Sequence, residues 1–276
     1  AQVLHESKLE IQGPSLVTGI ETILEREQEL LKQLLEFLKS HTRPDIDAIA
    51  VTVGPGLEPA LWVGINFAKA LAHVWKLPIV PVNHMEGHII ISLLRNDDSN
   101  QKTVNRKLPD SSVHCSLFTV HFPMLSLLIS GGHTELILSR KWMQYEYIGR
   151  TRDDAVGEAF DKVARMLGLP YPGGPAISKL AEAERNNVGI YEIPTLPRPM
   201  MHEKNFDFSF AGLKTAVLRK VEANTPITEE FKKQLAREFE DAVTDVLVDK
   251  TMRAIEAFGV KTLVIGGGVS ANRSIR

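Results

Sequence analysis

The feature that most restricts the fold of this chain is a set of three short apolar runs, each of which ends in a cluster of glycines. The runs and their glycine clusters are 47–53 with Gly54-Pro55-Gly56, 124–130 with Gly131-Gly132, and 262–265 with Gly266-Gly267-Gly268. Short apolar runs bounded by glycine are typical of strands that end in a turn. Longer stretches with apolar residues at three- and four-residue steps, such as 20–38, predict helices. Strands that alternate with helices predict an α/β layer architecture.

The length of 276 residues suits two α/β domains rather than one short module. Because each half opens with strands and turns on glycines, we expect an N-terminal domain over residues 1–123, a C-terminal domain over residues 124–276 and a cleft between them. Residues 135–139 are expected to pair back on residues 124–130 as a hairpin. The polar residues 95–110 predict a connector or a surface insertion.

Charge and cysteine content narrow the class of function. Lys plus Arg is 32 and Asp plus Glu is 34, and the net charge of −2 argues against a protein that coats nucleic acid by bulk electrostatics. Six basic residues could form a local RNA patch or only a solvated helix face: Lys204, Lys214, Arg219, Lys220, Lys232 and Lys233. The single cysteine, Cys115, excludes an internal disulfide. No apolar run approaches the roughly 20 residues of a membrane helix, so we expect a cytoplasmic protein.

Two histidines four residues apart, His84 and His88, directly follow an apolar run at 77–82. Positions four apart on a helix share a face, so both imidazoles can bind one metal. Glu86 points to the other side, which argues against the His-Glu-x-x-His arrangement of metalloproteases. A surface pair without metal is the alternative, but α/β sheets usually bind ligands where a strand gives way to a helix. Two histidines leave coordination positions open, so a third ligand must come from elsewhere.

The later glycine clusters are candidate phosphate or nucleotide loops. Ser130, Gly131 and Gly132 can offer backbone N–H groups and a hydroxyl to a phosphate, and Thr134 can add a second hydroxyl. An ordinary hairpin turn explains the same residues equally well. The glycines after 262–265 lead to Asn272 at the start of an expected helix, which could present an amide to a nucleotide.

Three acids at spacings of four and three, Asp154, Glu158 and Asp161, are expected to share one face of a helix. Such a face could contact a ligand. Acids near a helix N-terminus also complement the helix dipole, so a purely structural role stays open.

Six motifs, in order, resemble the bacterial TsaD family of tRNA N6-adenosine threonylcarbamoyltransferases, formerly called O-sialoglycoprotein endopeptidases. They are His-Met-Glu-Gly-His at 84–88, Leu-Ile-Ser-Gly-Gly-His-Thr at 128–134, Asp-Asp-Ala-Val-Gly-Glu-Ala-Phe-Asp-Lys at 153–162, Tyr-Pro-Gly-Gly-Pro at 171–175, Asp-Phe-Ser-Phe-Ala-Gly-Leu-Lys-Thr at 207–215 and Gly-Gly-Gly-Val-Ser-Ala-Asn at 266–272. The resemblance implies an actin/Hsp70/sugar-kinase-like (ASKHA) α/β fold, in which two RNase H-like domains surround a nucleotide cleft.

The resemblance also implies roles for particular residues. His84 and His88 would hold one divalent metal, Fe²⁺ or Zn²⁺. The residues around threonylcarbamoyl-AMP would be Leu128, Ile129, Ser130, Gly131, Gly132, Asp161, Gly174 and Asn272. Asp161 would face the ribose hydroxyls and Asn272 the adenine, and ADP or ATP could occupy the same cleft. No residue is assigned as the general base.

The implied activity is transfer of the threonylcarbamoyl group from threonylcarbamoyl-AMP to N6 of adenosine 37 in tRNAs that read ANN codons. TsaB and TsaE are the implied partner proteins. One alternative is a carbamoyltransferase of the hydrogenase-maturation or antibiotic type, which shares the two histidines. Another is a non-catalytic scaffold similar to TsaB, against which the paired histidines argue. The family pattern includes an early phosphate-binding strand and a later Asp metal ligand that this chain does not contain, so we expect a chain that lacks both ends of the pattern and has impaired activity.

Overall fold

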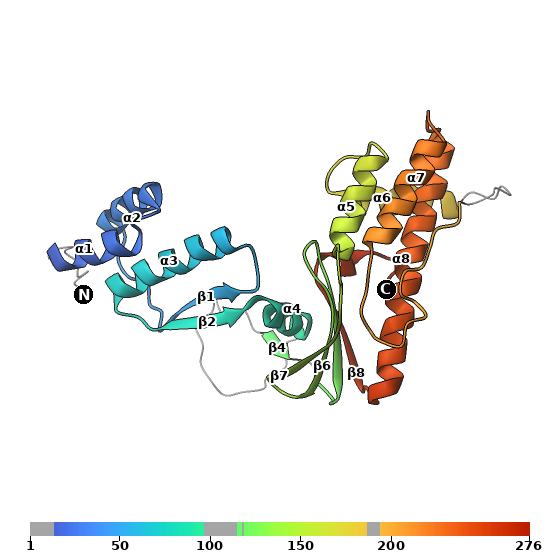
Figure 1. Cartoon of the computed structure of the whole chain (residues 1–276). Helices are drawn as coiled ribbons and strands as arrows, with labels where there is room; N and C mark the ends of the chain where they lie inside the picture. The colour runs from blue at the N-terminus through green and yellow to red at the C-terminus, as the bar shows by residue number, and fades with distance from the viewer. Residues whose placement is uncertain (1–13, 97–114, 118, 187–193) are drawn as a thin grey trace. The chain divides into compact units, whose positions relative to one another are not determined.

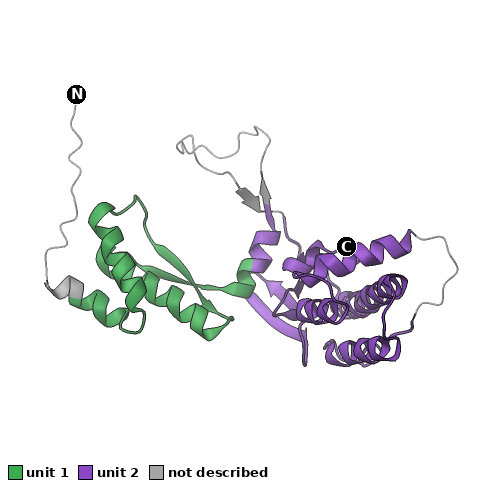
Figure 2. Cartoon of the chain, turned by 90° about the horizontal axis from the view of Figure 1, so that it is seen from above, with its two compact units in different colours: residues 1–87 green, residues 88–276 purple. Residues whose placement is uncertain are grey.

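The computed structural model describes residues 14–96, 115–117, 119–186 and 194–276. The chain divides into two compact units, Ala1–Gly87 and His88–Arg276, which Figure 2 distinguishes by colour. This division falls inside helix α4 (His84–Ser92), whereas the sequence placed the expected domain boundary at residues 123 and 124. Most of the expected polar connector lies outside the described residues.

In the described part of unit 1, the elements run in the order α1 (Pro14–Ile23), α2 (Gln28–Ser40), β1 (Ile49–Gly54), α3 (Glu58–Trp75) and β2 (Ile79–Asn83). The single helix predicted over residues 20–38 is wrong, because the chain turns between α1 and α2. The turn lets Ile20, before it, and Leu34, after it, pack into the same core as Val74 of α3. β1 and β2 pair in parallel, as expected for strands joined by a helix.

The main sheet of unit 2 has the strand order β7-β6-β5-β8. Its strands are β5 (Met124–Ile129), β6 (Thr134–Lys141), β7 (Gln144–Arg150) and β8 (Thr262–Gly266). β5 pairs antiparallel with β6 and parallel with β8, so that Leu128 lies opposite both Glu135 and Gly266. The predicted hairpin is therefore confirmed. A separate antiparallel ladder joins β3 (Leu94–Asn96) to β4 (Cys115–Leu117).

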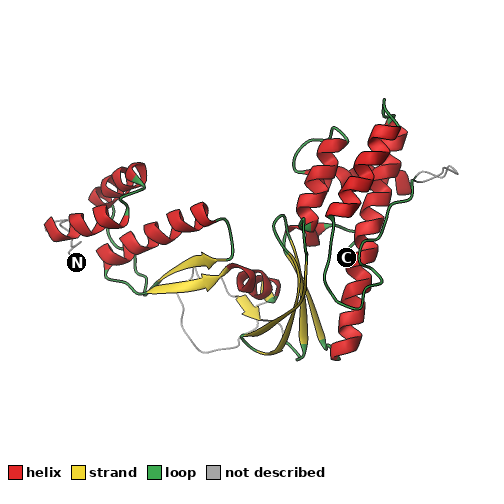
Figure 3. Cartoon of the chain, in the orientation of Figure 1, coloured by secondary structure: helices red, strands yellow, loops and turns green. Residues whose placement is uncertain are grey.

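Helices cover one side of this sheet, as Figures 1 and 3 show. They are α5 (Val156–Met166), α6 (Gly173–Arg185), α7 (Ala211–Ala223) and α8 (Glu229–Phe258). Leu127 of β5 shares their core with Phe160 and Phe239, whose rings meet edge to face at 5.1 Å. A fully buried side chain of this size contributes about 1.5–3 kcal/mol by burial alone. The layered α/β architecture predicted from the sequence is confirmed.

Among the residues that the structure describes, no helix is both long and apolar enough to cross a membrane.

Candidate nucleotide pocket and histidine pair

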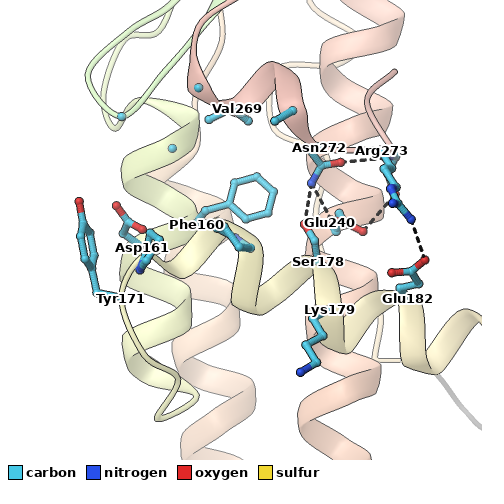
Figure 4. Close-up of a pocket in the computed structure, with 18 of the residues that line it drawn as sticks. Phe160, Asp161, Tyr171, Ser178, Lys179, Glu182, Glu240, Val269, Asn272 and Arg273 are labelled. Atoms are coloured by element: carbon cyan, nitrogen blue, oxygen red, sulfur yellow. Dashed lines mark hydrogen bonds and ion pairs between the residues drawn. The ribbon is translucent and has the colours of Figure 1, made fainter.

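A pocket of about 780 Å³ lies in unit 2, at the glycine-rich ends of β5 and β8. The first two turns of α5 and the length of α6 line it, and so does the short 3-10 helix η1 (Gly268–Ala271). Four of the residues predicted to bind the adenylate lie in its wall: Gly131, Asp161, Gly174 and Asn272. Figure 4 shows Asp161 on one side of the pocket and Asn272 on the other. The fold thus gathers in one place residues that are far apart in the sequence.

The other four predicted residues do not line this pocket. Leu128 and Ile129 are 1% and 0% exposed, so only their backbone could reach a ligand. The Ser130 hydroxyl accepts hydrogen bonds from the N–H groups of Gly132, at 3.3 Å, and His133, at 3.1 Å. Ser130 and Gly132 therefore shape the turn that presents Gly131.

Thr134, expected as a hydroxyl donor to a ligand, is fully buried. Its Oγ1 accepts a hydrogen bond from the N–H of Val156 at 2.8 Å. The N–H of Gly157 donates to the carbonyl of Ser130 at 3.1 Å. These bonds hold the first turn of α5 against the glycine turn. Thr134 therefore has a structural role, and the prediction that it donates a hydrogen bond to a ligand is wrong.

The glycines around the pocket fall into two classes. A Cβ on Gly267 would lie 2.3 Å from the carbonyl oxygen of Ile129, and the φ of +91° at this position also favours glycine. A Cβ on Gly173 would lie 2.6 Å from the Cβ of Ala164. By contrast, a Cβ on Gly131 or Gly174 would meet nothing within 4 Å. Gly173 and Gly267 are required by the packing of the protein, whereas Gly131 and Gly174 leave open space in the pocket.

The predicted acidic face does not form as expected. α5 begins at Val156, so Asp154 precedes the helix. Asp154 accepts hydrogen bonds from the ammonium groups of Lys162, at 2.8 Å, and Lys214, at 2.7 Å. Burial alone would raise the pKa of Asp154, but these two lysines outweigh burial and hold it below its usual value. Asp154 thus connects α5 to α7 through its ion pairs with Lys162 and Lys214.

Asp161 remains a candidate ligand residue, because it lies on α5 and lines the pocket. Its Oδ1 accepts a hydrogen bond from the N–H of Gly173, the first residue of α6, at 2.7 Å. In the described part of the chain, no protein donor reaches its Oδ2. One oxygen therefore orients the carboxylate, and the other is available to a hydroxyl group.

Asn272 is held by a buried carboxylate that sequence reasoning missed. Its Nδ2 donates to Oε1 of Glu240 at 2.6 Å and to the hydroxyl of Ser178 at 2.9 Å, as Figure 4 shows. Glu240 also accepts from Arg185 at 2.6 Å. Burial would raise the pKa of Glu240, but the hydrogen bonds from Ser178, Arg185 and Asn272 keep it below its usual value. The helix expected after Asn272 is wrong within this chain, since η1 ends at Ala271.

The two predicted metal ligands lie on α4, one helical turn apart. Asn83 fixes the start of this helix, because its Oδ1 accepts hydrogen bonds from the N–H groups of Met85, at 2.9 Å, and Glu86, at 3.2 Å. His84 is exposed and His88 half-buried. Two imidazoles on one face fit the nitrogen donors that Zn²⁺ and Fe²⁺ accept. Within the described ranges there is no group of three His, Cys, Asp or Glu side chains that could hold a metal ion.

The α/β layers and the pocket at the glycine-rich strand ends agree with the actin/Hsp70/sugar-kinase-like (ASKHA) class of folds, to which the TsaD family belongs. The model of the TsaD family, described as tRNA N6-adenosine threonylcarbamoyltransferase, matches residues 22–102 and 112–276. The chain belongs to the TsaD family.

Curated relatives agree with this family. A tRNA N6-adenosine threonylcarbamoyltransferase of Ralstonia pickettii is 48% identical over 239 residues, which cover 85% of this chain and 61% of that protein. Proteins of the same name from Chromobacterium violaceum and Persephonella marina are 45% and 43% identical, over 84% of this chain in both cases and over 62% and 59% of their own lengths. The chain thus spans about three fifths of the length of these relatives.

Proposed function

We propose that this chain carries the nucleotide pocket of an enzyme that transfers the threonylcarbamoyl group from threonylcarbamoyl-AMP to N6 of adenosine 37 in tRNAs reading ANN codons. The observation that carries the proposal is the convergence of Gly131, Asp161, Gly174 and Asn272 on one pocket in a member of the TsaD family. The matched relatives bear the name of this activity.

The chemistry explains why a transferase needs such a pocket. The lone pair on N6 of adenosine is delocalised into the ring, so N6 is a poor nucleophile and requires an activated carbonyl. A mixed anhydride with AMP supplies one, and its adenylate half must be held while the bond to the carbonyl breaks. Backbone N–H groups at the glycine turn would stabilise the charge that develops on the phosphate.

Individual residues have defined parts in this proposal. Gly131 and Gly174 leave the space that the adenylate would fill. Asp161 would accept a hydrogen bond from a ribose hydroxyl through Oδ2, since Oδ1 is held by Gly173. Asn272 forms part of the wall, and its amide could bond to adenine only by giving up one of its present partners.

We also propose a divalent metal, Fe²⁺ or Zn²⁺, on α4. His84 and His88 would supply two of its ligands, and its Lewis acidity would polarise the phosphate and carbonyl oxygens of the donor. Metal binding requires a neutral imidazole at both positions.

The partners follow from the substrate and from the family. We propose that the protein binds its tRNA through a local surface, because the net charge of −2 gives no general attraction to RNA. Of the six basic residues considered, Lys214 and Lys232 are already paired, with Asp154 and Glu229. TsaB and TsaE are proposed partner proteins, and the cytoplasm, where tRNA is modified, is the proposed compartment.

Two neighbouring glycines provide a direct test of the pocket. In Gly174→Ala the new methyl group enters open space, so the melting temperature should stay close to the wild-type value while affinity for AMP falls at least tenfold. In Gly173→Ala the methyl group meets α5, so the protein itself should be destabilised. Calorimetric titration with AMP and thermal unfolding separate the two effects. Wild-type affinity in a stable Gly174→Ala protein would exclude this pocket as the adenylate site.

Activity is tested in a bacterial strain depleted of its own enzyme. Expression of the full-length gene should restore threonylcarbamoyladenosine in tRNA, measured by mass spectrometry of digested tRNA, and His84→Ala should abolish it. Normal modification with His84→Ala would remove this residue from the metal site. Glu86→Ala, a neighbouring change on the same helix, serves as the control.

A further inference from the structure

Glu240 occupies an unusual position for a charged side chain. It is 1% exposed and lies in the middle of α8, yet it lines the nucleotide pocket. Its two carboxylate oxygens accept hydrogen bonds from Ser178 at 2.6 Å, Arg185 at 2.6 Å, Asn272 at 2.6 Å and Ser274 at 3.0 Å. The partners belong to α6 and to the segment after η1, so one carboxylate connects three parts of the pocket wall.

The side chain of Asn272 has no spare hydrogen-bonding capacity. Its Nδ2 donates both hydrogens, to Ser178 and Glu240, and its Oδ1 accepts from the N–H groups of Ser274 at 2.9 Å and Ile275 at 3.2 Å. The two ends of the amide are therefore distinguished by their surroundings. Only a group that accepts hydrogen bonds can sit where Oε1 of Glu240 lies.

We infer that Glu240 is a positioning residue for the nucleotide pocket, which sets the orientation of Asn272 and holds the 272–275 segment against α6. The inference deepens the proposed function, on which it rests for the identity of the ligand. A wall fixed before binding spares the ligand the cost of ordering it, so the loss of this carboxylate should weaken binding. The effect acts through Asn272 and its neighbours, not through contact of Glu240 with the ligand.

The isosteric change Glu240→Gln tests this mechanism. All four partners donate hydrogen bonds to Glu240. In the glutamine variant the side-chain NH₂ would therefore face another donor wherever it lies: Asn272 if it replaces Oε1, or Arg185 if it replaces Oε2. The volume is kept, which limits the damage to packing. We expect affinity for AMP to fall at least tenfold and the Asn272 side-chain NH₂ protons to exchange faster with solvent in NMR spectra.

Glu238 provides a matched control on the same helix. It is 9% exposed, accepts hydrogen bonds from Arg198 and from the N–H of Leu196, and does not line the pocket. Glu238→Gln should lower the melting temperature by an amount similar to Glu240→Gln but change the AMP affinity less than twofold. Equal losses of AMP affinity in the two variants would mean that Glu240 only stabilises the fold, and this result would overturn the inference.

A second variant restores the hydrogen-bonding pattern. In Glu240→Gln with Asn272→Asp, the glutamine NH₂ can donate to the new carboxylate, and its oxygen can still accept from Arg185. We expect this pair to regain at least part of the affinity lost in Glu240→Gln, whereas no recovery would count against the orienting role. If the wild-type chain binds no AMP, the proposed function fails. The positioning role is then tested by the exchange rate of the Asn272 NH₂ protons alone, which should rise in Glu240→Gln and not in Glu238→Gln.

Discussion

The central strand of the unit 2 sheet is far more buried than either strand of the unit 1 sheet. Every residue of β5 in unit 2 is buried. In unit 1 the strands β1 and β2 expose apolar side chains, such as Val53 at 45% and Val80 at 46%. β5 has a hydrogen-bonded strand on both sides, whereas β1 pairs, among the described residues, only with β2. A pocket built from strand ends needs a rigid sheet, and unit 2 supplies one from its own core.

The largest effect we predict comes from removing a ring from the core of unit 2. Phe239 is 0% exposed, so Phe239→Ala should lower the free energy of unfolding of unit 2 by about 3–5 kcal/mol and abolish AMP binding. Leu34→Ala, at a 2% exposed position of unit 1, should cost about 2–5 kcal/mol in that unit and leave AMP affinity unchanged. Denaturant unfolding and calorimetric titration provide both measurements.

This pair of variants also tests whether the units are energetically separate. If Leu34→Ala weakens AMP binding as strongly as Phe239→Ala does, the two units unfold together and the comparison between them is wrong. Hydrogen exchange resolved by peptide shows which unit each substitution has loosened.

The same contrast explains how much the sequence could predict. Strands that end in glycines depend on local patterns, so the positions of β1, β5 and β8 and the β5–β6 hairpin could be predicted. The role of Glu240 could not, because an acid in the middle of a long charged helix has the same local pattern whether it faces solvent or the pocket. The ligand-binding roles predicted for Thr134 and Asp154 are wrong for a related reason. Their hydrogen-bond partners, Val156 and Lys214, come close to them only through tertiary packing, which local patterns do not reveal.

Within the site, the sequence identified the glycines but could not separate their functions. Gly173 and Gly174 are adjacent and chemically identical, yet only the packing of α5 against α6 makes Gly173 necessary to the fold. The family resemblance grouped Leu128 and Ile129 with the binding residues, although their side chains belong to the core.

A second prediction measures the contrast between the sheets without mutation. Amides of β5 should exchange at least about 100-fold more slowly than those of β1, which corresponds to about 2.7 kcal/mol of opening free energy. The reason is that a strand paired on both sides opens only with the core, whereas an edge strand opens locally. Mass spectrometry of peptides covering Ile49–Gly54 and Met124–Ile129 provides the measurement. Equal protection of the two peptides would mean that burial in this structure does not report local stability.

The smallest effect concerns acid. Asp154 is ionised and paired with Lys162 and Lys214, and its lowered pKa means that folding favours its charged form. This contribution is complete above the unfolded-state pKa of about 3.9 and is lost as the pH falls through the lower folded-state value. Asp154→Asn should therefore lower the free energy of unfolding of unit 2 by about 1 kcal/mol at pH 7 and by the same amount at pH 5, and by progressively less below pH 4. Urea unfolding at these pH values checks the trend. A difference that disappears already between pH 7 and pH 5 would show that another group is titrating, and a loss of exchange protection in unit 1 would show that Asp154 does not act within unit 2 alone.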